Sequence, residues 1–364
     1  MRNAQLILED GTVFSGKSFG YEGSVAGEVV FSTAMTGYVE SLTDPSYAGQ
    51  LVTLTYPIVG NYGVPSTSLV ETTKAQHGLH TFMESDKIYL SALIVSEYSD
   101  NYSHWNAQES LGDWLKRERV PGITGIDTRE LTKVLREHGV MHGKILIEGV
   151  GDEPEFKAYS DINYVAEVSC KEIIRYNEGA DKKVVLVDCG VKNNILRCLV
   201  DRGVEVIRVP WDYDFNSLDF DGLFLANGPG DPNNCEVAVA NIKNFLGGKV
   251  RPLMGICMGN QLLAKAVGTS VYKLKYGHRS HNQPVRMVGT NKCYITSQNH
   301  GFAVDASKLP ADWTSYFENM NDGSNEGICH KHNPWYSAQF HPEAFGGPVD
   351  TMFLFDNFIK NLSL

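Results

Sequence analysis

A cysteine between two glycines, in the stretch GICMGNQ, is the residue of this sequence best placed to do chemistry. Cys257 follows the apolar run PLMGI and precedes a run that is typical of a helix. A strand, a Gly-x-Cys-x-Gly turn and a helix together form a nucleophile elbow, in which small neighbours permit a strained turn that exposes the side chain. The start of a helix also favours a thiolate. A buried structural cysteine at a strand end fits this stretch about equally well.

The other cysteines argue against a disulfide at Cys257. The chain has seven cysteines, an odd number scattered along the sequence, which is typical of a reducing compartment such as the cytoplasm. They are Cys170, Cys189, Cys198, Cys235, Cys257, Cys293 and Cys329.

Two stretches look superficially like halves of a metal site. The first contains His278 and His281, and the second contains Cys329, His330 and His332. Zinc sites need about four converging ligands, and neither stretch has an evident second half. We therefore interpret these residues as solvated loop histidines and expect no metal.

The stretch SAQFHPEA supplies the partners that a thiol nucleophile needs. His341 is followed by Pro342, which favours extended backbone around it, so that His341 and Glu343 can point the same way. An imidazole and a carboxylate held in this way form a base and the group that orients it. A surface turn explains this stretch well on its own, but poorly when the elbow at Cys257 is also present.

Two glycine-bearing loops are expected near the same place. NGPGDP follows one predicted strand, and SQNHGFAV lies at the end of another β-prone run. Glycine loops are often mere connections, but ligands of a parallel sheet gather beyond the carboxyl ends of its strands. The sequence therefore predicts a ligand site at this edge.

The elements that must position these residues fall into two parts. Residues 1–145 predict a β-rich α/β domain, with a hairpin around Asp10 and Gly11 and one clear helix starting near Asp127 and ending at Gly139. Residues 146–182 are polar and glycine-bearing and are interpreted as a connecting segment. Residues 183–364 alternate strand-like and helix-like runs, which predicts an open, mostly parallel sheet with crossover helices.

One phosphate-loop match is rejected. Residues 11–18, GTVFSGKS, fit the pattern G-x-x-x-x-G-K-[ST], but that chemistry needs a helix directly after the loop. The following residues are too rich in glycine to form one. We expect a hairpin here instead.

Composition excludes several classes of function. The 364 residues carry a net charge of −11, whereas nucleic-acid and anionic-membrane binders need a basic field. No apolar run approaches the roughly 20 residues that cross a bilayer, and the acidic start is not a signal peptide. We expect a cytoplasmic protein that binds neither nucleic acid nor membrane.

The motifs NGPGDP, GICMGNQ and FHPE, in this order, resemble those of the class I glutamine amidotransferase family over about residues 183–364. The stretches LEDGTVFSGKSFG, LTYPIVGNYGV and PGITGIDTRELT look like the small-subunit domain of carbamoyl phosphate synthetase. The resemblance implies a chain that hydrolyses L-glutamine and passes ammonia to a large subunit. That subunit would make carbamoyl phosphate from bicarbonate, ATP and Mg²⁺, for pyrimidine and arginine biosynthesis, and this chain would need no cofactor.

The resemblance also implies roles for single residues. Cys257 would form a γ-glutamyl thioester, His341 would act as base and then acid, and Glu343 would orient the imidazole. The N–H groups of Gly230 and Met258 would stabilise the oxyanion. The residues that would bind glutamine are Ser46, Gly228, Gly230, Met258, Gln261, Asn299, Gly301 and Phe302.

Two positions depart from the family pattern, and two other functions stay open. Many relatives have His where this chain has Asn260, and Leu where it has Met258. The first alternative is an amidotransferase subunit of another synthetase or a stand-alone hydrolase, against which the N-terminal stretches argue. The second is a catalytically silent regulatory or docking subunit, against which the presence of all three catalytic residues argues.

Overall fold

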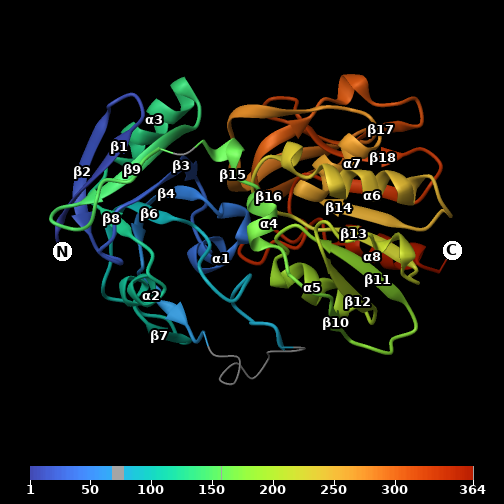
Figure 1. The fold of residues 1–364 in the computed structure, drawn as a ribbon, viewed down its shortest axis with the longest axis horizontal. Coiled ribbons are helices and arrows are strands. Elements are labelled where there is room, and N and C mark those ends of the chain that lie inside the picture. The colour runs from blue at the N-terminus through green and yellow to red at the C-terminus, as the bar shows by residue number, and fades with distance from the viewer. Residues whose placement is uncertain (68–77, 157, 364) are drawn as a thin grey trace. The chain divides into compact units, whose positions relative to one another are not determined.

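The computed structural model describes residues 1–67, 78–156 and 158–363. It divides into two compact units, Met1–Ile162 and Asn163–Leu364 (Figure 1). The division falls inside the predicted connecting segment, in which residue 157 lies outside the described residues. The exact limits of the two domains and of the connecting segment stay a prediction.

The first unit is built on a closed barrel, in which the strands follow the order β1-β2-β8-β6-β4-β3-β9. β1 and β2 form the predicted hairpin around Asp10 and Gly11, and β4 pairs in parallel with β3 and β6. The strands are β1 (Asn3–Leu8), β2 (Val13–Ser18), β3 (Val25–Ser32), β4 (Gln50–Val59), β6 (Ala92–Tyr98), β8 (Gly122–Thr124) and β9 (Met141–Ile147). A separate two-stranded sheet joins β5 (Val64–Pro65) and β7 (Ala107–Glu109).

The helices of this unit are α1 (Tyr38–Thr43), α2 (Leu111–Arg117) and α3 (Thr128–His138). The predicted limits of α3 are confirmed: the Asp127 side chain accepts a hydrogen bond from the Glu130 N–H at 2.9 Å, and Gly139 ends the helix at φ 97°. Leu131 and Leu135 are its buried face. The rejection of a phosphate loop is confirmed too, since residues 13–18 form β2 and the next element is strand β3.

The second unit contains one sheet in the order β10-β12-β11-β13-β14-β19-β18-β16-β15-β17. The pairs along β12-β11-β13-β14-β19 are parallel, which confirms the predicted α/β architecture. The remaining pairs are antiparallel, so the sheet is mixed and its parallel part is smaller than predicted. The strands are β10 (Ile174–Tyr176), β11 (Lys183–Asp188), β12 (Glu205–Pro210), β13 (Gly222–Leu225), β14 (Leu253–Ile256), β15 (Val271–Met287), β16 (Cys293–Val304), β17 (Trp313–Asn319), β18 (Asn325–His330) and β19 (Trp335–Ala338).

Helices cover both faces of the parallel half, as Figure 1 shows for α6, α7 and α8. Alternate strand residues point to opposite faces. Leu223 and Leu225 join the core under α6 and α7, whereas Phe224 between them stacks on Phe355 and meets Phe358 edge-to-face, both on α8. The helices are α4 (Tyr164–Val168), α5 (Asn193–Val200), α6 (Glu236–Leu246), α7 (Met258–Ala266) and α8 (Phe353–Asn361).

The register of this sheet determines which loops meet. Leu225 of β13 is the partner of Gly255 of β14, and Ile256 is the partner of Ala338 of β19. The carboxyl ends of three neighbouring strands therefore lie at one edge. The segments that leave this edge carry the glycine loop after β13, Cys257 after β14, and His341 after β19.

Candidate active site

Cys257 sits on a strained turn between β14 and α7. Its backbone has φ 53° and ψ −104°, a conformation that residues other than glycine rarely adopt and that is found at functional sites. The Cys257 N–H donates to the carbonyl of Ala338 at 2.8 Å, which fixes the turn to β19. A Cβ atom on Gly259 would lie 2.2 Å from the carbonyl oxygen of Leu225, so only glycine fits there. The predicted elbow geometry is confirmed, and the role of Cys257 as nucleophile stays a prediction.

His341 and Glu343 lie beyond the end of β19 and are buried. The His341 N–H donates to the carbonyl of Ser297 at 2.9 Å, which ties the segment to β16. The imidazole Nδ1 lies 2.7 Å from Oε1 of Glu343, which is the predicted contact between a base and its orienting group. The Nε2 atom is buried without a hydrogen-bond partner among the described residues. It is the nitrogen left for the thiol of Cys257, whose side chain interacts with this imidazole.

Lys192 completes the charged group and was missed by sequence reasoning. Its Nζ lies 2.7 Å from Oε1 of Glu343, and both side chains are buried. Lys192 follows β11 and directly precedes α5, so it comes from the same carboxyl edge of the sheet. A lysine just after the predicted strand KVVLVD was the available signal.

Burial and charge determine the protonation states of these side chains. Burial raises the pKa of Glu343, but Lys192 and His341 outweigh this effect and lower it to about 2. Burial and Lys192 lower the pKa of His341, but Glu343 and Cys257 raise it to about 9. An imidazole that keeps its proton at neutral pH is a suitable counter-ion for a thiolate and a suitable acid for a leaving amine.

The glycine loop follows β13, the strand that pairs with β14, so it begins next to the turn that carries Cys257. A Cβ atom on Gly228 would come within 2.0 Å of the carbonyl oxygen of Cys189, and Gly230 has φ 86°. Both positions therefore require glycine. Met258 is the first residue of α7, where N–H groups have no acceptor within the helix. Gly230 thus lies on the loop after β13, and Met258 directly follows Cys257 at the start of α7.

Hydrogen bonds join some of the predicted glutamine-binding residues of this unit to Cys257 or to one another. The thiol donates to the carbonyl of Asn299 at 3.6 Å. The Gln261 amide on α7 donates to the carbonyl of Phe302 at 3.3 Å, which joins the elbow helix to β16. Gly301 lies between Asn299 and Phe302 on β16. Ser46 belongs to the other unit, in which its N–H donates to Asp44 at 2.9 Å, and its part in the site stays a prediction.

Asn260, the departure from the family pattern, has a structural explanation. It is fully buried and joins α7 to β19. Its amide donates to Oε1 of Gln339 at 2.8 Å, and its own Oδ1 accepts from the Ser337 hydroxyl at 2.8 Å. The same Gln339 oxygen accepts from Gln261 at 3.3 Å. Asn260 therefore holds the helix that carries Met258 and Gln261.

The interpretation of His278 and His281 as solvated loop histidines was wrong. Both lie on strand β15, where His278 is 8% exposed and His281 is half-buried. Burial and the charges of Lys192 and His341 lower the pKa of His281 to about 4, so it stands uncharged near the active site. The second stretch matches the prediction better, since His332 is exposed and His330 half-buried.

His278, His300 and Glu326 together offer atoms of the kind that bind metals, all within 4.8 Å of one another. Hydrogen bonds already engage these groups. The nitrogens of His278 contact Asp322 at 3.0 Å and Glu326 at 3.3 Å, and His300 Nδ1 contacts the carbonyl of Phe302 at 2.8 Å. A hydrogen-bonded network accounts for this cluster without a metal ion.

The described residues include no helix that is both long and apolar enough to span a membrane. All seven cysteines are free thiols.

Comparison with known proteins gives matches along nearly the whole chain. A family model described as carbamoyl-phosphate synthase small chain, CPSase domain, matches residues 6–145, and one described as glutamine amidotransferase class-I matches residues 185–361. The chain is 48% identical over 368 residues to the carbamoyl phosphate synthase arginine-specific small chain of Phaeosphaeria nodorum. That alignment covers 100% of this chain and 76% of the relative.

Some relatives are much longer than this chain. It is 50% identical over 378 residues to the multifunctional protein pyr1-3 of Dictyostelium discoideum, an alignment that covers 98% of this chain and 17% of that protein. Among solved structures, it is similar to a glutamine amidotransferase from Thermotoga maritima at 22% identity and a TM-score of 0.37. That match covers 45% of this chain and 76% of the other, and is too distant to add to the argument.

Proposed function

Because the chain belongs to the carbamoyl-phosphate synthase small-chain family, we propose that it is the glutamine-hydrolysing chain of a carbamoyl phosphate synthetase. It converts L-glutamine to glutamate and ammonia, and a large subunit uses the ammonia with bicarbonate and ATP. The product supplies pyrimidine and arginine biosynthesis. The observation that carries the proposal is Cys257 at a strained elbow beside the buried pair of His341 and Glu343.

The reaction begins when the Cys257 thiol gives its proton to His341 and the resulting thiolate attacks the side-chain amide carbon of glutamine. Negative charge develops on the amide oxygen, where the N–H groups of Gly230 and Met258 are the proposed donors. Losing one such donor typically costs about 3 kcal/mol of transition-state stabilisation. The C–N bond then breaks as His341 gives its proton to the leaving nitrogen. Ammonia leaves, and a γ-glutamyl thioester remains on the sulfur.

Water completes the cycle. Neutral His341 takes a proton from the attacking water, whose oxygen bonds to the acyl carbon as the C–S bond breaks. Glutamate leaves after its new carboxyl group has lost a proton to solvent, and the thiolate and imidazolium are restored. Glu343 stabilises the imidazole whenever it is charged, and Lys192 keeps Glu343 ionised. This chemistry needs no cofactor in the chain.

Substrate binding falls to the residues around this centre. Asn299 is supported by its contact with Cys257, and Gln261 and Phe302 by their contact with each other. Gly301 is supported by its place between Asn299 and Phe302 on β16. The close approach of backbone at Gly228 supports its assignment to the same site. For Ser46 the support is the family resemblance alone.

The partner is a large subunit that holds ATP, Mg²⁺ and bicarbonate. Free ammonia is mostly protonated at neutral pH and is then no nucleophile, so direct transfer between the subunits is expected. The free thiols support work in a reducing compartment, and we propose the cytoplasm. The net charge of −11 supports a role without nucleic acid.

The test pairs Cys257→Ala with a large subunit from the same organism. We expect glutamine-dependent synthesis of carbamoyl phosphate to be lost, while synthesis from ammonium chloride continues. Glutamine-dependent synthesis by the variant would show that Cys257 is not the nucleophile. Glutamine hydrolysis by the wild-type chain without activation of this large subunit would favour an amidotransferase of another synthetase. The absence of any hydrolysis in the wild-type complex would favour a silent docking subunit.

A further inference from the structure

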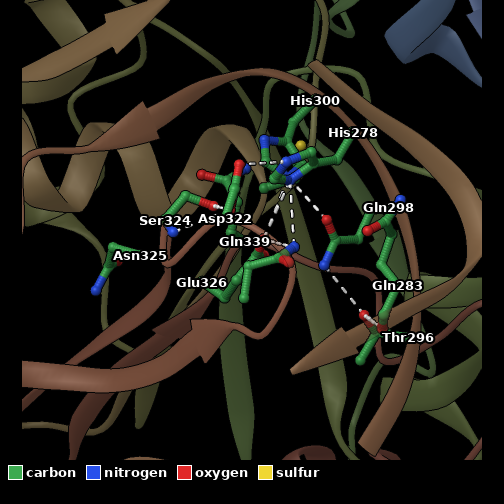
Figure 2. A network of polar contacts seen from close by, with 12 residues as sticks. His278, Gln283, Thr296, Gln298, His300, Asp322, Ser324, Asn325, Glu326 and Gln339 are labelled. Carbon is green, nitrogen blue, oxygen red and sulfur yellow. Dashed lines mark hydrogen bonds and ion pairs between the residues drawn. The ribbon is translucent and has the colours of Figure 1, made fainter. Parts of the chain in front are cut away.

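A second buried polar cluster lies on the strands that carry the glutamine-binding residues. His278 of β15 and His300 of β16 are cross-strand partners, so their side chains share one face of the sheet. Their rings lie 4.9 Å apart in an edge-to-face arrangement, visible in Figure 2. Neither residue has a part in the proposed chemistry. The cluster therefore needs an explanation of its own.

His278 lies between two carboxylates. Its Nε2 is 3.0 Å from Oδ2 of Asp322, and its Nδ1 is 3.3 Å from Oε1 of Glu326. Only a doubly protonated ring donates to both. The Asn319 amide donates to the same Glu326 oxygen at 2.9 Å, and the N–H of Ser324 donates to Asp322 at 3.0 Å. The imidazole thus lies between two carboxyl groups (Figure 2), and the Asn319 amide also lies 3.4 Å from its Nδ1.

Electrostatics agrees with this geometry. Burial lowers the pKa of His278, but the contacts with Glu326 and Asp322 raise it above its usual value overall. Burial raises the pKa of Glu326 above its usual value, and His278 opposes that effect only in part. Burial and the charge of His278 hold the pKa of His300 well below its usual range. Burial, and to a lesser degree the neighbouring His278, thus keep His300 neutral.

His300 connects the cluster to the substrate site. Its Nε2 lies 3.2 Å from Oε1 of Gln298 and 3.8 Å from Oε1 of Glu326. Its Nδ1 donates to the carbonyl of Phe302 at 2.8 Å. That carbonyl also accepts the hydrogen bond from Gln261. The Phe302 carbonyl therefore accepts one hydrogen bond from the cluster, through His300, and one from the elbow helix α7, through Gln261.

We propose that His278, held between Asp322 and Glu326, is a positioning residue that fixes His300 and so the Phe302–Gln261 contact, and thereby determines the affinity for glutamine. The proposal rests on the proposed function. His278 does not touch the reacting atoms, so its loss raises KM for glutamine and leaves kcat nearly unchanged. It acts through a charged hydrogen-bond network, and losing such contacts typically weakens binding by tenfold or more.

The test measures glutamine hydrolysis by the full chain in complex with its large subunit. We expect His278→Ala to raise KM roughly tenfold while kcat stays within about twofold. His278→Gln retains one donor and is expected to recover part of the affinity. His332→Ala replaces an exposed histidine of the same unit and is the matched control, with wild-type KM.

Two further variants distinguish a positioning role of His278 from a general disturbance of the fold. Asp322→Asn keeps an oxygen for Ser324 but loses the charge, so it should fold and raise KM in the same direction by a smaller factor. The double variant His278→Ala, Glu326→Gln should have the KM of the worse single variant, because both changes break one network. The alkylation rate of Cys257 by iodoacetamide should match wild type in each folded variant.

Two results would overturn the proposal. Unchanged KM in folded His278→Ala and Asp322→Asn would do so, as would a fall in kcat at constant KM. A wild-type complex that hydrolyses no glutamine would instead refute the proposed function itself, and the inference with it.

Discussion

The imidazole of His341 has a pKa of about 9 because Glu343 and Cys257 act against burial and Lys192. Its protonated form is present below this pH and is lost above it. The proposed mechanism needs that proton when ammonia leaves. Glutamine hydrolysis should therefore decline as pH rises through about 9.

Glu343→Gln removes the negative charge that raises the pKa of His341. Burial and Lys192 then dominate, so the proton is lost at lower pH. We expect the alkaline limb of kcat/KM for glutamine to move downward, with lower activity at neutral pH. A pH profile of the variant complex measures this shift. An unmoved limb would mean that another group is responsible for it.

Lys192→Met also changes the pKa of His341, but is expected to raise it. Removing the ammonium takes away a charge that lowers the pKa of His341, so the alkaline limb should move upward. The methionine has a similar length, so the site stays filled. The same pH profile applies, and a downward shift would mean that Lys192 does not lower the pKa of His341.

At the scale of elements, the elbow depends on how α7 is attached to β19. Asn260 makes that attachment through Ser337 and Gln339. We expect Asn260→Ala to lower the free energy of unfolding by about 1–3 kcal/mol, because it leaves buried polar groups without partners. Chemical denaturation measures the loss. The control Asn244→Ala changes an exposed residue of α6 and should stay within about 0.5 kcal/mol of wild type. Equal stability of the two variants would exclude this role.

Local patterns were sufficient to predict several elements. The helix α3 was predictable because its cap, its apolar face and its final glycine are all local. The hairpin of β1 and β2 and the alternation of strands with helices after residue 183 were predictable for the same reason. The closure of the barrel was not, because β1 pairs with β9 across more than a hundred residues. In the antiparallel half of the second sheet, the pairings of β15 with β17 and of β16 with β18 skip a strand, and no local pattern specifies them.

The site shows the same limit. The elbow and the His-Pro-Glu segment are local patterns and were visible. Lys192 was missed because its contact with Glu343 joins two loops that only the sheet brings together. His278 was misread because glycine and polar neighbours suggest a loop. Its burial depends on Glu326 and Asp322, which lie on and before another strand.

At the scale of the whole molecule, the chain combines a barrel unit with an amidotransferase unit. The related protein pyr1-3 contains a matching segment within a far longer chain. In the proposed function, this chain supplies ammonia to a large subunit. This view predicts that ammonia made at Cys257 reaches its acceptor within the complex.

The most direct test of the central claim is to trap the acyl enzyme. The wild-type complex is mixed with glutamine, quenched in acid during turnover, and digested for mass spectrometry. The account predicts one glutamyl group on the peptide that contains Cys257, and none in Cys257→Ala. A glutamyl group on another residue, or turnover by Cys257→Ala at the wild-type rate, would contradict it.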